Sequence, residues 1–372
     1  CWIGRLYSFL VTKWIHHSKM VLISRKAVIR TVVAMSAISF FDYYLRSQSF
    51  VKSLHNAIDP VQSPTRGMQK FISAFPEHIS NISSYQDFHN SLDFGIPVPC
   101  NLNIAFMGDS LTRYQYLDLV YFLSHNGTWV SLEDRPNLVI EKTHPDWNDF
   151  YEFTNKILKP HENCDCFRNE GQMNTNVVIE NRYFHDSRNN NTVTYLQKFG
   201  EVPFKTSWNV SDIYHHHELV KNIENVSFVQ HFGWLDTVKK FVCKMSPKPS
   251  HFIFNSGLWT DSDLSDLDVQ FDIVRALRDC DIISIYKTTT MTKNHQMGGI
   301  EDRERLCKLT NICLNVSWTG SFIPPDKYWD NAHFYPPIYS MLNIHLLSLL
   351  ASEGGLGLSK TELTKEKLNT NQ

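Results

Sequence analysis

The most informative segment of the chain is Asn101-Leu-Asn-Ile-Ala-Phe-Met-Gly-Asp-Ser-Leu-Thr-Arg-Tyr-Gln115. Residues 104–107 form a short apolar run between polar neighbours, which is typical of a strand buried on both faces of a parallel sheet. Residues 108–110 interrupt this run, and apolar residues then recur at helical spacing until residues 126–127, Asn-Gly. The segment therefore predicts a buried strand, a tight turn and a helix.

Ser110 lies between the end of this predicted strand and the first turn of the predicted helix. Open α/β sheets place their sites at the carboxyl ends of strands, and an N–H group at a helix N-terminus can stabilise an anion. Ser110 is therefore a candidate nucleophile. Asp and Ser are also common helix caps, so this hypothesis depends on a base and an oxyanion donor elsewhere in the chain.

The composition excludes nucleic acid as a partner. The 372 residues include 36 basic and 38 acidic side chains, for a net charge of −2, so there is no basic surplus. The hydrophobic share of 42% is enough for a sizeable core. Nine Trp and fifteen Tyr would suit stacking on sugar rings, but aromatic side chains fill cores more often.

Glycosylation sequons and cysteines indicate an oxidising compartment. Asn-x-Ser/Thr sequons occur along the chain at Asn81, Asn126, Asn190, Asn209, Asn225 and Asn315. All but one of the eight cysteines lie beyond residue 99, namely Cys100, Cys164, Cys166, Cys243, Cys280, Cys307 and Cys313. We expect most of them to pair, with Cys307–Cys313 as a candidate local disulfide.

The chain divides into four predicted regions. Residues 1–45 form a leader whose apolar stretch, 27–41, is short for a membrane span of about 17–25 residues and suits a signal peptide or a signal anchor. Residues 46–98 form a stem, 99–352 a catalytic domain and 353–372 a polar tail. We expect an uncleaved anchor, with the domain in the Golgi or ER lumen as part of a single-pass membrane protein; a secreted protein is the alternative.

Short apolar runs alternate with helical patterns in the predicted domain. Further strands are expected at 177–179, 251–254 and 281–286, and further helices at 264–277 and 337–350. This alternation predicts an α/β fold, a three-layer α/β/α sandwich with a mostly parallel sheet. Residues 185–231 are polar and rich in Asn and His, so we expect long surface loops there.

Asp330 and His333 lie three residues apart, just ahead of the last predicted helix. A tight turn would let the Asp330 carboxylate accept a hydrogen bond from His333 Nδ1, which leaves Nε2 free to take a proton from Ser110. Asp-x-x-His before a helix is also an ordinary capping arrangement. The pair is therefore a catalytic candidate only in combination with Ser110.

Asn255 directly follows the predicted strand 251–254. Its side-chain amide could donate to an oxyanion alongside the Ser110 N–H, and losing one such donor typically lowers the rate by about 10²–10³. A simple turn asparagine is the alternative. We expect the three segments to open onto one edge of the sheet.

The order of these blocks resembles the SGNH (GDSL-type) hydrolase superfamily, with Gly-Asp-Ser-Leu first, an Asn later and Asp-x-x-His last. Residues 108–115 and 255–259 are similar to its PC-esterase branch, which includes the trichome-birefringence-like polysaccharide O-acetyltransferases of plant walls. The α/β-hydrolase motif fits less well, because it needs glycine where Thr112 stands. The resemblance covers about thirty residues between 101 and 340.

This resemblance implies Ser110 as nucleophile, Asp330 and His333 as its partners, and Asn255 in the oxyanion hole. It also implies supporting roles for Asp109 and Arg113 and a further oxyanion glycine, for which Gly233 is one candidate. The sequence departs from the branch at Tyr114, where Asn is frequent, and lacks a recognisable Cys-rich segment before the serine block.

The implied function is acyl-ester chemistry on glycans through an acetyl-serine intermediate. A polysaccharide or glycan O-acetyltransferase, using an acetyl donor as co-substrate, is the primary prediction. A carbohydrate acetylesterase is the alternative, because transferase and hydrolase share every residue named. A catalytically inactive glycan-binding protein is the alternative of another class, although such a role would not require Ser, Asp and His together.

Two clusters have the composition of metal-binding sites: residues 161–166 (His-Glu-Asn-Cys-Asp-Cys) and the three histidines at 215–217. Zinc sites need paired ligand groups, and the first cluster lacks a second half. In a lumenal protein its cysteines would more often form disulfides. We therefore expect no metal and no other bound cofactor.

Overall fold

The computed structural model describes residues 98–129, 141–158, 160–168, 178–215, 225–294, 303–352 and 357–358, all within one compact unit of the chain. The predicted leader with its stretch 27–41, the stem up to residue 97 and most of the polar tail lie outside the described residues. Within the described ranges, no helix has the length and apolar character that a membrane span requires.

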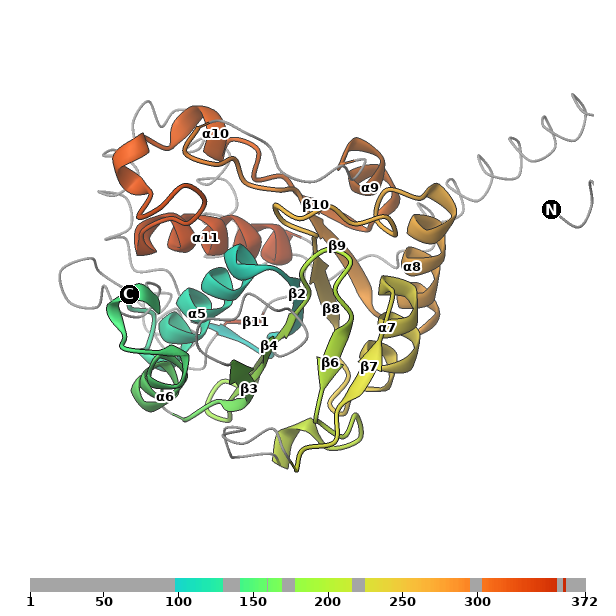
Figure 1. The fold of residues 1–372 in the computed structure, drawn as a ribbon, viewed down its shortest axis with the longest axis horizontal. Helices are drawn as coiled ribbons and strands as arrows, with labels where there is room; N and C mark the ends of the chain where they lie inside the picture. Colours follow the sequence, from blue (N-terminus) through green and yellow to red (C-terminus); the bar gives the residue numbers. More distant parts are fainter. Residues whose placement is uncertain are drawn as a thin grey trace, which may run out of the picture. The chain divides into compact units, whose positions relative to one another are not determined.

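A seven-stranded, mostly parallel sheet forms the centre of the domain (Figure 1). In spatial order its strands are β10 (Ile312–Leu314), β9 (Ile283–Lys287), β8 (His251–Phe254), β2 (Asn103–Gly108), β5 (Asn191–Gln197), β4 (Val178–Asp186) and β3 (Asn163–Arg168). The strands from β10 to β5 pair in parallel, whereas β4 and β3 continue the sheet antiparallel. The prediction of an α/β fold with a mostly parallel sheet is confirmed.

Strand β2 is buried on both faces, as its apolar run predicts. Ile104 and Phe106 belong to one hydrophobic cluster, and Ala105 and Met107 belong to a second. This division follows from the alternation of side chains along a strand. β2 hydrogen-bonds to β8 on one side and to β5 on the other.

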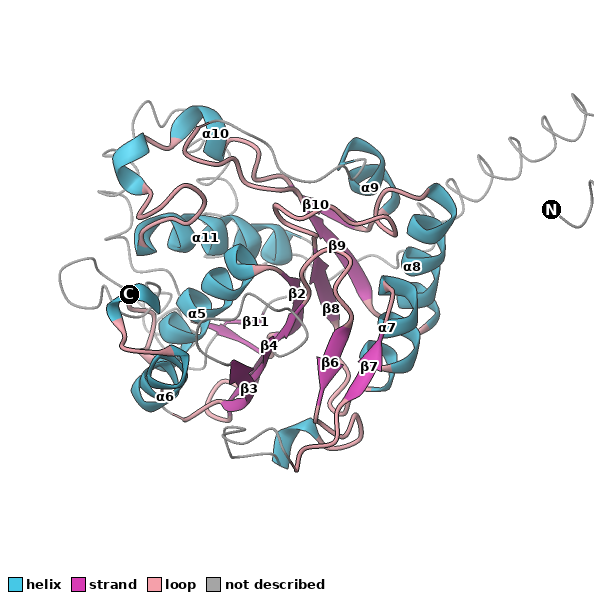
Figure 2. Cartoon of the chain, viewed as in Figure 1, coloured by secondary structure: helices cyan, strands magenta, loops and turns pink. Residues whose placement is uncertain are grey.

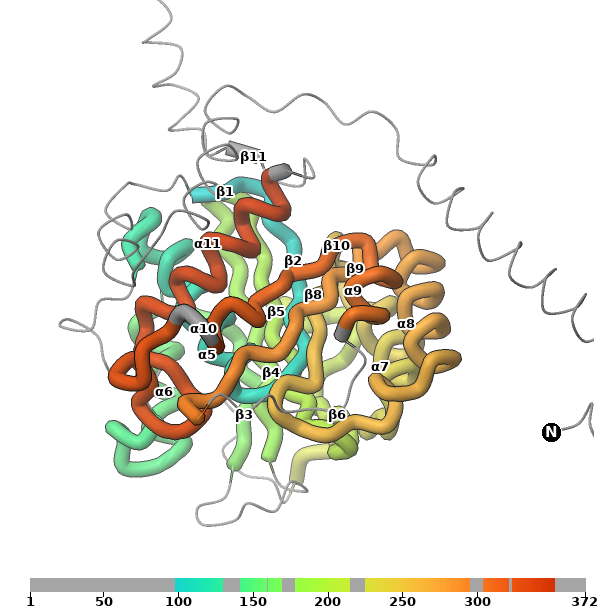
Figure 3. Tube along the Cα trace, turned by 90° about the horizontal axis from the view of Figure 1, so that it is seen from above, coloured from blue at the N-terminus to red at the C-terminus, as the bar shows by residue number. Residues whose placement is uncertain are grey.

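Helices cover both faces of the sheet (Figures 2 and 3). One cluster contains the buried sides of α5 (Ser110–Ser124), α6 (Trp147–Ile157) and α11 (Pro336–Ser352). The other contains those of α7 (Trp234–Lys240), α8 (Leu267–Asp279) and α9 (Arg303–Leu309). Smaller elements complete the domain: α10 (Thr319–Phe322), the strand pairs β1 (Pro99–Cys100) with β11 (Gly357–Leu358) and β6 (Phe204–Thr206) with β7 (Val229–His231), and the 3-10 turns η2 (Glu141–Thr143), η4 (Ile213–His215), η5 (Val242–Lys244) and η6 (Pro325–Lys327).

The prediction of long surface loops over residues 185–231 is wrong for residues 191–197, because they form β5, a fully buried strand beside β2. The polar side chain that begins this strand is buried with hydrogen-bond partners on both of its amide atoms. Asn191 Oδ1 accepts from the Leu102 N–H at 2.9 Å, and its amide donates to the Pro99 carbonyl at 2.8 Å. Polar composition alone therefore gave the wrong prediction for this strand, because a polar group that has a hydrogen-bond partner can be buried at little cost in free energy.

Three disulfides occur in the described residues. Cys307–Cys313 closes a short loop, as predicted. Cys243–Cys280 joins η5 to the end of α8, and Cys164–Cys166 lies within β3.

Candidate active site

Ser110 is the first residue of α5, at the carboxyl end of β2. Asp109 caps this helix, because its Oδ1 accepts from the backbone N–H groups of Leu111 and Thr112. The side chain of Ser110 is only partly buried, and its own N–H donates to no described residue. Ser110 therefore presents a hydroxyl and a backbone donor at the positive end of the helix dipole.

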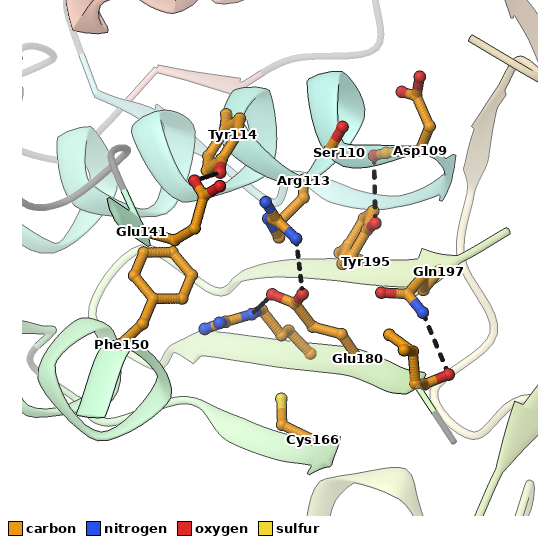
Figure 4. Close-up of polar contacts among 12 residues, drawn as sticks. Asp109, Ser110, Arg113, Tyr114, Glu141, Phe150, Cys166, Glu180, Tyr195 and Gln197 are labelled. Carbon is orange, nitrogen blue, oxygen red and sulfur yellow. Dashed lines mark hydrogen bonds and ion pairs between the residues drawn. The ribbon is translucent and has the colours of Figure 1, made fainter. Parts of the chain in front are cut away.

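The turn before Ser110 is held from below by Tyr195 on β5 (Figure 4). The Tyr195 hydroxyl lies 3.1 Å from both the Gly108 and the Asp109 carbonyl oxygens. Gly108 has no room for a side chain, because a Cβ there would lie 2.6 Å from Asn255 Oδ1. The glycine thus lets Asn255 pack directly against the turn that carries Ser110.

His333 lies at hydrogen-bond distance from Ser110. Its Nε2 is 2.7 Å from Ser110 Oγ, and its Nδ1 is 2.8 Å from Asp330 Oδ2. The loop that holds this pair is closed by a bridge between Tyr328 and Phe334, just before α11. Because a carboxylate only accepts, Nδ1 carries the proton and Nε2 is the acceptor for the Ser110 hydroxyl.

Helix α11 brings this loop to Ser110 by packing along α5. Ser340 donates to Asp118 Oδ1 at 3.0 Å, and the Asn343 amide donates to Asp118 Oδ2 and to the Gln115 carbonyl, both at 2.9 Å. All of these polar side chains are buried. Two helices that are more than 200 residues apart in the chain are thereby held in register.

Two aromatic rings orient the imidazole of His333. Trp329 stacks on it with ring centroids 5.0 Å apart and an interplanar angle of 15°. Tyr114 meets it edge-on at 5.3 Å and 88°. A flat stack on one side and an edge on the other restrict rotation of the ring.

Asp330 is ionised in this arrangement. Burial raises its pKa, but the hydrogen bonds from the His333 side chain, the His333 N–H and the Ala332 N–H outweigh burial and hold the pKa well below its ordinary value. The carboxylate therefore remains negative and can support a positively charged imidazolium on His333.

Asn255 follows β8, whose carboxyl end lies beside that of β2. Its side-chain Oδ1 accepts from the Thr112 hydroxyl at 2.9 Å. Among the described residues, no group accepts a hydrogen bond from Asn255 Nδ2. The amide is thus held by its oxygen, and its donor group is left for another partner.

Asp109 links the loop of Ser110 to the loop of Asn255. Its Oδ2 accepts from the Leu258 N–H at 3.1 Å, while Oδ1 caps α5. Gly257 has a φ of +66°, and a Cβ at this position would lie 1.9 Å from Asp109 Oδ2. Asp109 therefore organises the two loops and is not part of the Ser110–His333–Asp330 chain of hydrogen bonds.

Arg113 points away from Ser110, towards β4 (Figure 4). Its Nη1 lies 3.0 Å from Glu180 Oε2, and the second Glu180 oxygen accepts from Arg182 at 2.7 Å. These side chains are at most 2% exposed. Arg113 therefore anchors α5 to the sheet.

Gly233 lies at the start of α7, and no described contact joins it to Ser110. The N-terminus of α7 already has a hydrogen-bond acceptor, because Asp263 Oδ2 accepts from the Trp234 N–H at 2.7 Å. A different glycine, Gly200, lies three residues after the end of β5, at the edge of the sheet where Ser110 lies. Its φ of +46° and its close packing against the Thr260 carbonyl mark a specialised turn that the sequence did not reveal.

In the described residues, side chains of the two metal-like clusters make contacts of other kinds. Cys164 and Cys166 are joined to each other, so neither is available as a thiolate ligand. His161 is exposed, and its Nδ1 lies 2.9 Å from the Asn155 carbonyl oxygen. His215 closes η4, whereas residues 216–217 lie outside the described residues.

Comparisons with protein-family models, with curated proteins and with solved structures gave no match. The resemblance to the SGNH superfamily therefore stays a prediction. The site combines a hydroxyl, an imidazole and a carboxylate in one hydrogen-bonded chain, with a backbone N–H and a side-chain amide beside it.

Proposed function

We propose that this protein is a serine-dependent acyl-transfer enzyme of the SGNH type, with the three-layer α/β/α architecture of that superfamily. The observation that carries the proposal is the hydrogen-bonded chain from Ser110 Oγ through His333 to Asp330, located at the carboxyl end of a central parallel strand. An unaided serine hydroxyl is a poor nucleophile, and an adjacent imidazole with an ionised carboxylate is what activates it.

In the proposed reaction, Ser110 Oγ attacks the carbonyl carbon of an acetyl ester while its proton passes to His333 Nε2. The resulting oxyanion accepts hydrogen bonds from the Ser110 N–H and Asn255 Nδ2. Collapse breaks the bond to the leaving alcohol, which takes the proton from His333 and leaves acetyl-Ser110. A second hydroxyl, from a sugar or from water, then attacks this ester and gives its proton to His333. The bond between Ser110 Oγ and the acyl carbon breaks, the proton returns from His333 to Ser110 Oγ, and the acetyl group leaves on the second hydroxyl.

A third oxyanion donor is expected from a backbone glycine. Gly233 and Gly200 are both candidates, and the topology favours Gly200. It follows β5, which hydrogen-bonds to β2, so its loop opens at the same edge as Ser110.

A glycan is the proposed acceptor, which makes O-acetyltransferase the preferred activity and carbohydrate acetylesterase the alternative. Trp259 is 39% exposed and pairs with Phe199 at a ring-centroid distance of 5.3 Å. Trp259 directly follows Leu258, whose N–H binds Asp109 next to Ser110. An exposed aromatic surface near the nucleophile suits stacking on a sugar ring.

The secretory pathway is the proposed location, as a single-pass protein of the Golgi or ER lumen or as a secreted protein. Two observations support it. Six of the described cysteines form three disulfides. The sequon asparagines in the described residues are all exposed: Asn126, Asn190, Asn209, Asn225 and Asn315.

The deciding experiment compares the parent protein with Ser110→Ala. A fluorophosphonate probe should label the parent at Ser110, and release of 4-nitrophenol from 4-nitrophenyl acetate should disappear in the variant, with the same melting temperature. Equal labelling and turnover in both proteins would refute the enzyme and favour a glycan-binding role. Incubation with an acetyl donor and oligosaccharides then separates the two activities, since acetylated sugar detected by mass indicates a transferase and free acetate alone an esterase.

A further inference from the structure

A lysine is buried directly behind the proposed oxyanion donor. Lys287 ends β9, where Tyr286 pairs with Phe254, the residue before Asn255. Its side chain is 1% exposed, and Nζ donates to Thr112 Oγ1 at 3.0 Å and to Gln115 Oε1 at 3.1 Å. Thr112 in turn donates to Asn255 Oδ1 at 2.9 Å, so a continuous chain of hydrogen bonds runs from the ammonium to the amide.

The direction of this chain follows from the chemistry of its members. An ammonium has only donors, so Thr112 Oγ1 must accept from Lys287. The single hydroxyl proton of Thr112 is then free for Asn255. The group that receives it must be the amide oxygen, because a rotated amide would present its own N–H groups to the hydroxyl. The ammonium therefore selects one orientation of the Asn255 amide, with Nδ2 on the other side.

We propose that Lys287 is a positioning residue for the oxyanion hole, acting through Thr112 to orient and polarise the Asn255 amide. This inference rests on the proposed function, because it assigns Asn255 the role of oxyanion donor. Hydrogen bonds in a chain strengthen one another, so a cation at one end increases the donor strength of Nδ2 at the other. The same positive charge also favours negative charge that develops in the transition state.

The surroundings of Lys287 are unusual for a structural lysine. In the described part of the chain, no carboxylate lies within ion-pair distance of its Nζ, and Asp109 is the charged group that acts on it from the neighbouring loop. Burial lowers the pKa of Lys287 to about 8, although Asp109 opposes this change. Burying a cation without a direct counter-ion costs free energy of folding. Such a group is typical of a functional site in which its charge acts on neighbouring residues.

A double-mutant cycle on turnover of 4-nitrophenyl acetate tests the inference. Lys287→Met should lower kcat about 10-fold with KM within about twofold, and Asn255→Ala should lower kcat by about 10²–10³. If the lysine acts through the amide, the double variant should lose no more than Asn255→Ala alone. Thr112→Val should behave like Lys287→Met, and Thr112→Ser, which keeps the hydroxyl, should retain kcat within about threefold.

The outcomes separate the inference from the function on which it rests. Losses that multiply in the double variant, or an Asn255→Ala variant with unchanged kcat, would overturn the role of Lys287 while Ser110-dependent turnover still supports the enzyme. A parent protein without Ser110-dependent turnover would overturn both. A folding defect is recognised from the melting temperature of each variant, and the matched pair Thr112→Ser and Thr112→Val separates loss of the hydroxyl from loss of packing.

Discussion

Asp330 contacts His333 through both carboxylate oxygens, since Oδ1 accepts the His333 backbone N–H at 2.7 Å and Oδ2 lies 2.8 Å from Nδ1. The backbone contact fixes the carboxylate, and the side-chain contact fixes the tautomer of the imidazole. The two residues therefore form one rigid unit, presented by the loop before α11.

Replacing Asp330 by Asn should remove most activity without unfolding the protein. An amide nitrogen opposite Nδ1 would favour the tautomer that carries its proton on Nε2, where Ser110 needs an acceptor. We expect kcat to fall by about 10³–10⁴ with little change in KM. Asp326→Asn, in the same loop but 70% exposed, is the control and should keep full activity. Parent-like kcat in Asp330→Asn would show that His333 does not depend on this carboxylate.

Replacing Gly257 by Ala should destabilise the protein through Asp109. The added Cβ would collide with the Asp109 carboxylate at 1.9 Å, and the φ of +66° strains any residue other than glycine. We expect the free energy of unfolding to fall by about 2–4 kcal/mol in chemical denaturation. Gly127→Ala, with a φ of +87° at the end of α5, should lose only about 1 kcal/mol. Equal losses at both positions would mean that the contact with Asp109 is unimportant.

Replacing Arg113 by Met should lower stability more than chemistry. The substitution leaves Glu180 buried with Arg182 as its remaining ionic partner, and breaking a buried ion pair typically costs about 3–5 kcal/mol. The folded fraction should still react with a fluorophosphonate within about threefold of the parent rate, because Arg113 points away from Ser110. A stable variant with a labelling rate reduced 100-fold would instead place Arg113 in the catalytic chemistry.

Replacing Asp118 by Asn should change how stability depends on pH. Burial raises the pKa of Asp118 to about 8, even though Asn343 and Ser340 donate to it. Its folded pKa thus exceeds its unfolded pKa, so the parent loses stability as pH rises from about 4 towards 8. The variant should gain stability relative to the parent between pH 5 and pH 8 in urea denaturation. Glu304→Gln, which removes an exposed carboxylate, should give a difference that is constant with pH.

The activity of the parent should decline as pH rises through about 8, because the Lys287 ammonium then loses its proton. Lys287→Met has no such group and should lack this part of the pH profile. Initial rates of ester turnover between pH 7 and pH 9.5, corrected for spontaneous hydrolysis, provide the measurement. An identical decline in both proteins would assign it to another group.

Local patterns were sufficient for several elements. The apolar run 104–107 predicted β2, and the helical spacing after Ser110 predicted α5, because burial and period are properties of short segments. The strand 251–254 was predicted with its observed bounds, and helix 337–350 within two residues. Residues 191–197 were misplaced because a strand rich in Asn and Thr is buried only when neighbouring strands satisfy its polar groups.

The sequence by itself determined the strand–turn–helix unit that carries Ser110 and the short loop in which Asp330 can reach His333, since both depend on neighbours a few residues apart. Only the tertiary structure decided that His333 meets Ser110 across 223 positions, that Arg113 faces Glu180, and that Lys287 lies behind Asn255. The physical reason is that strand order and helix packing choose which distant side chains share a space. No pattern within a single segment specifies that choice.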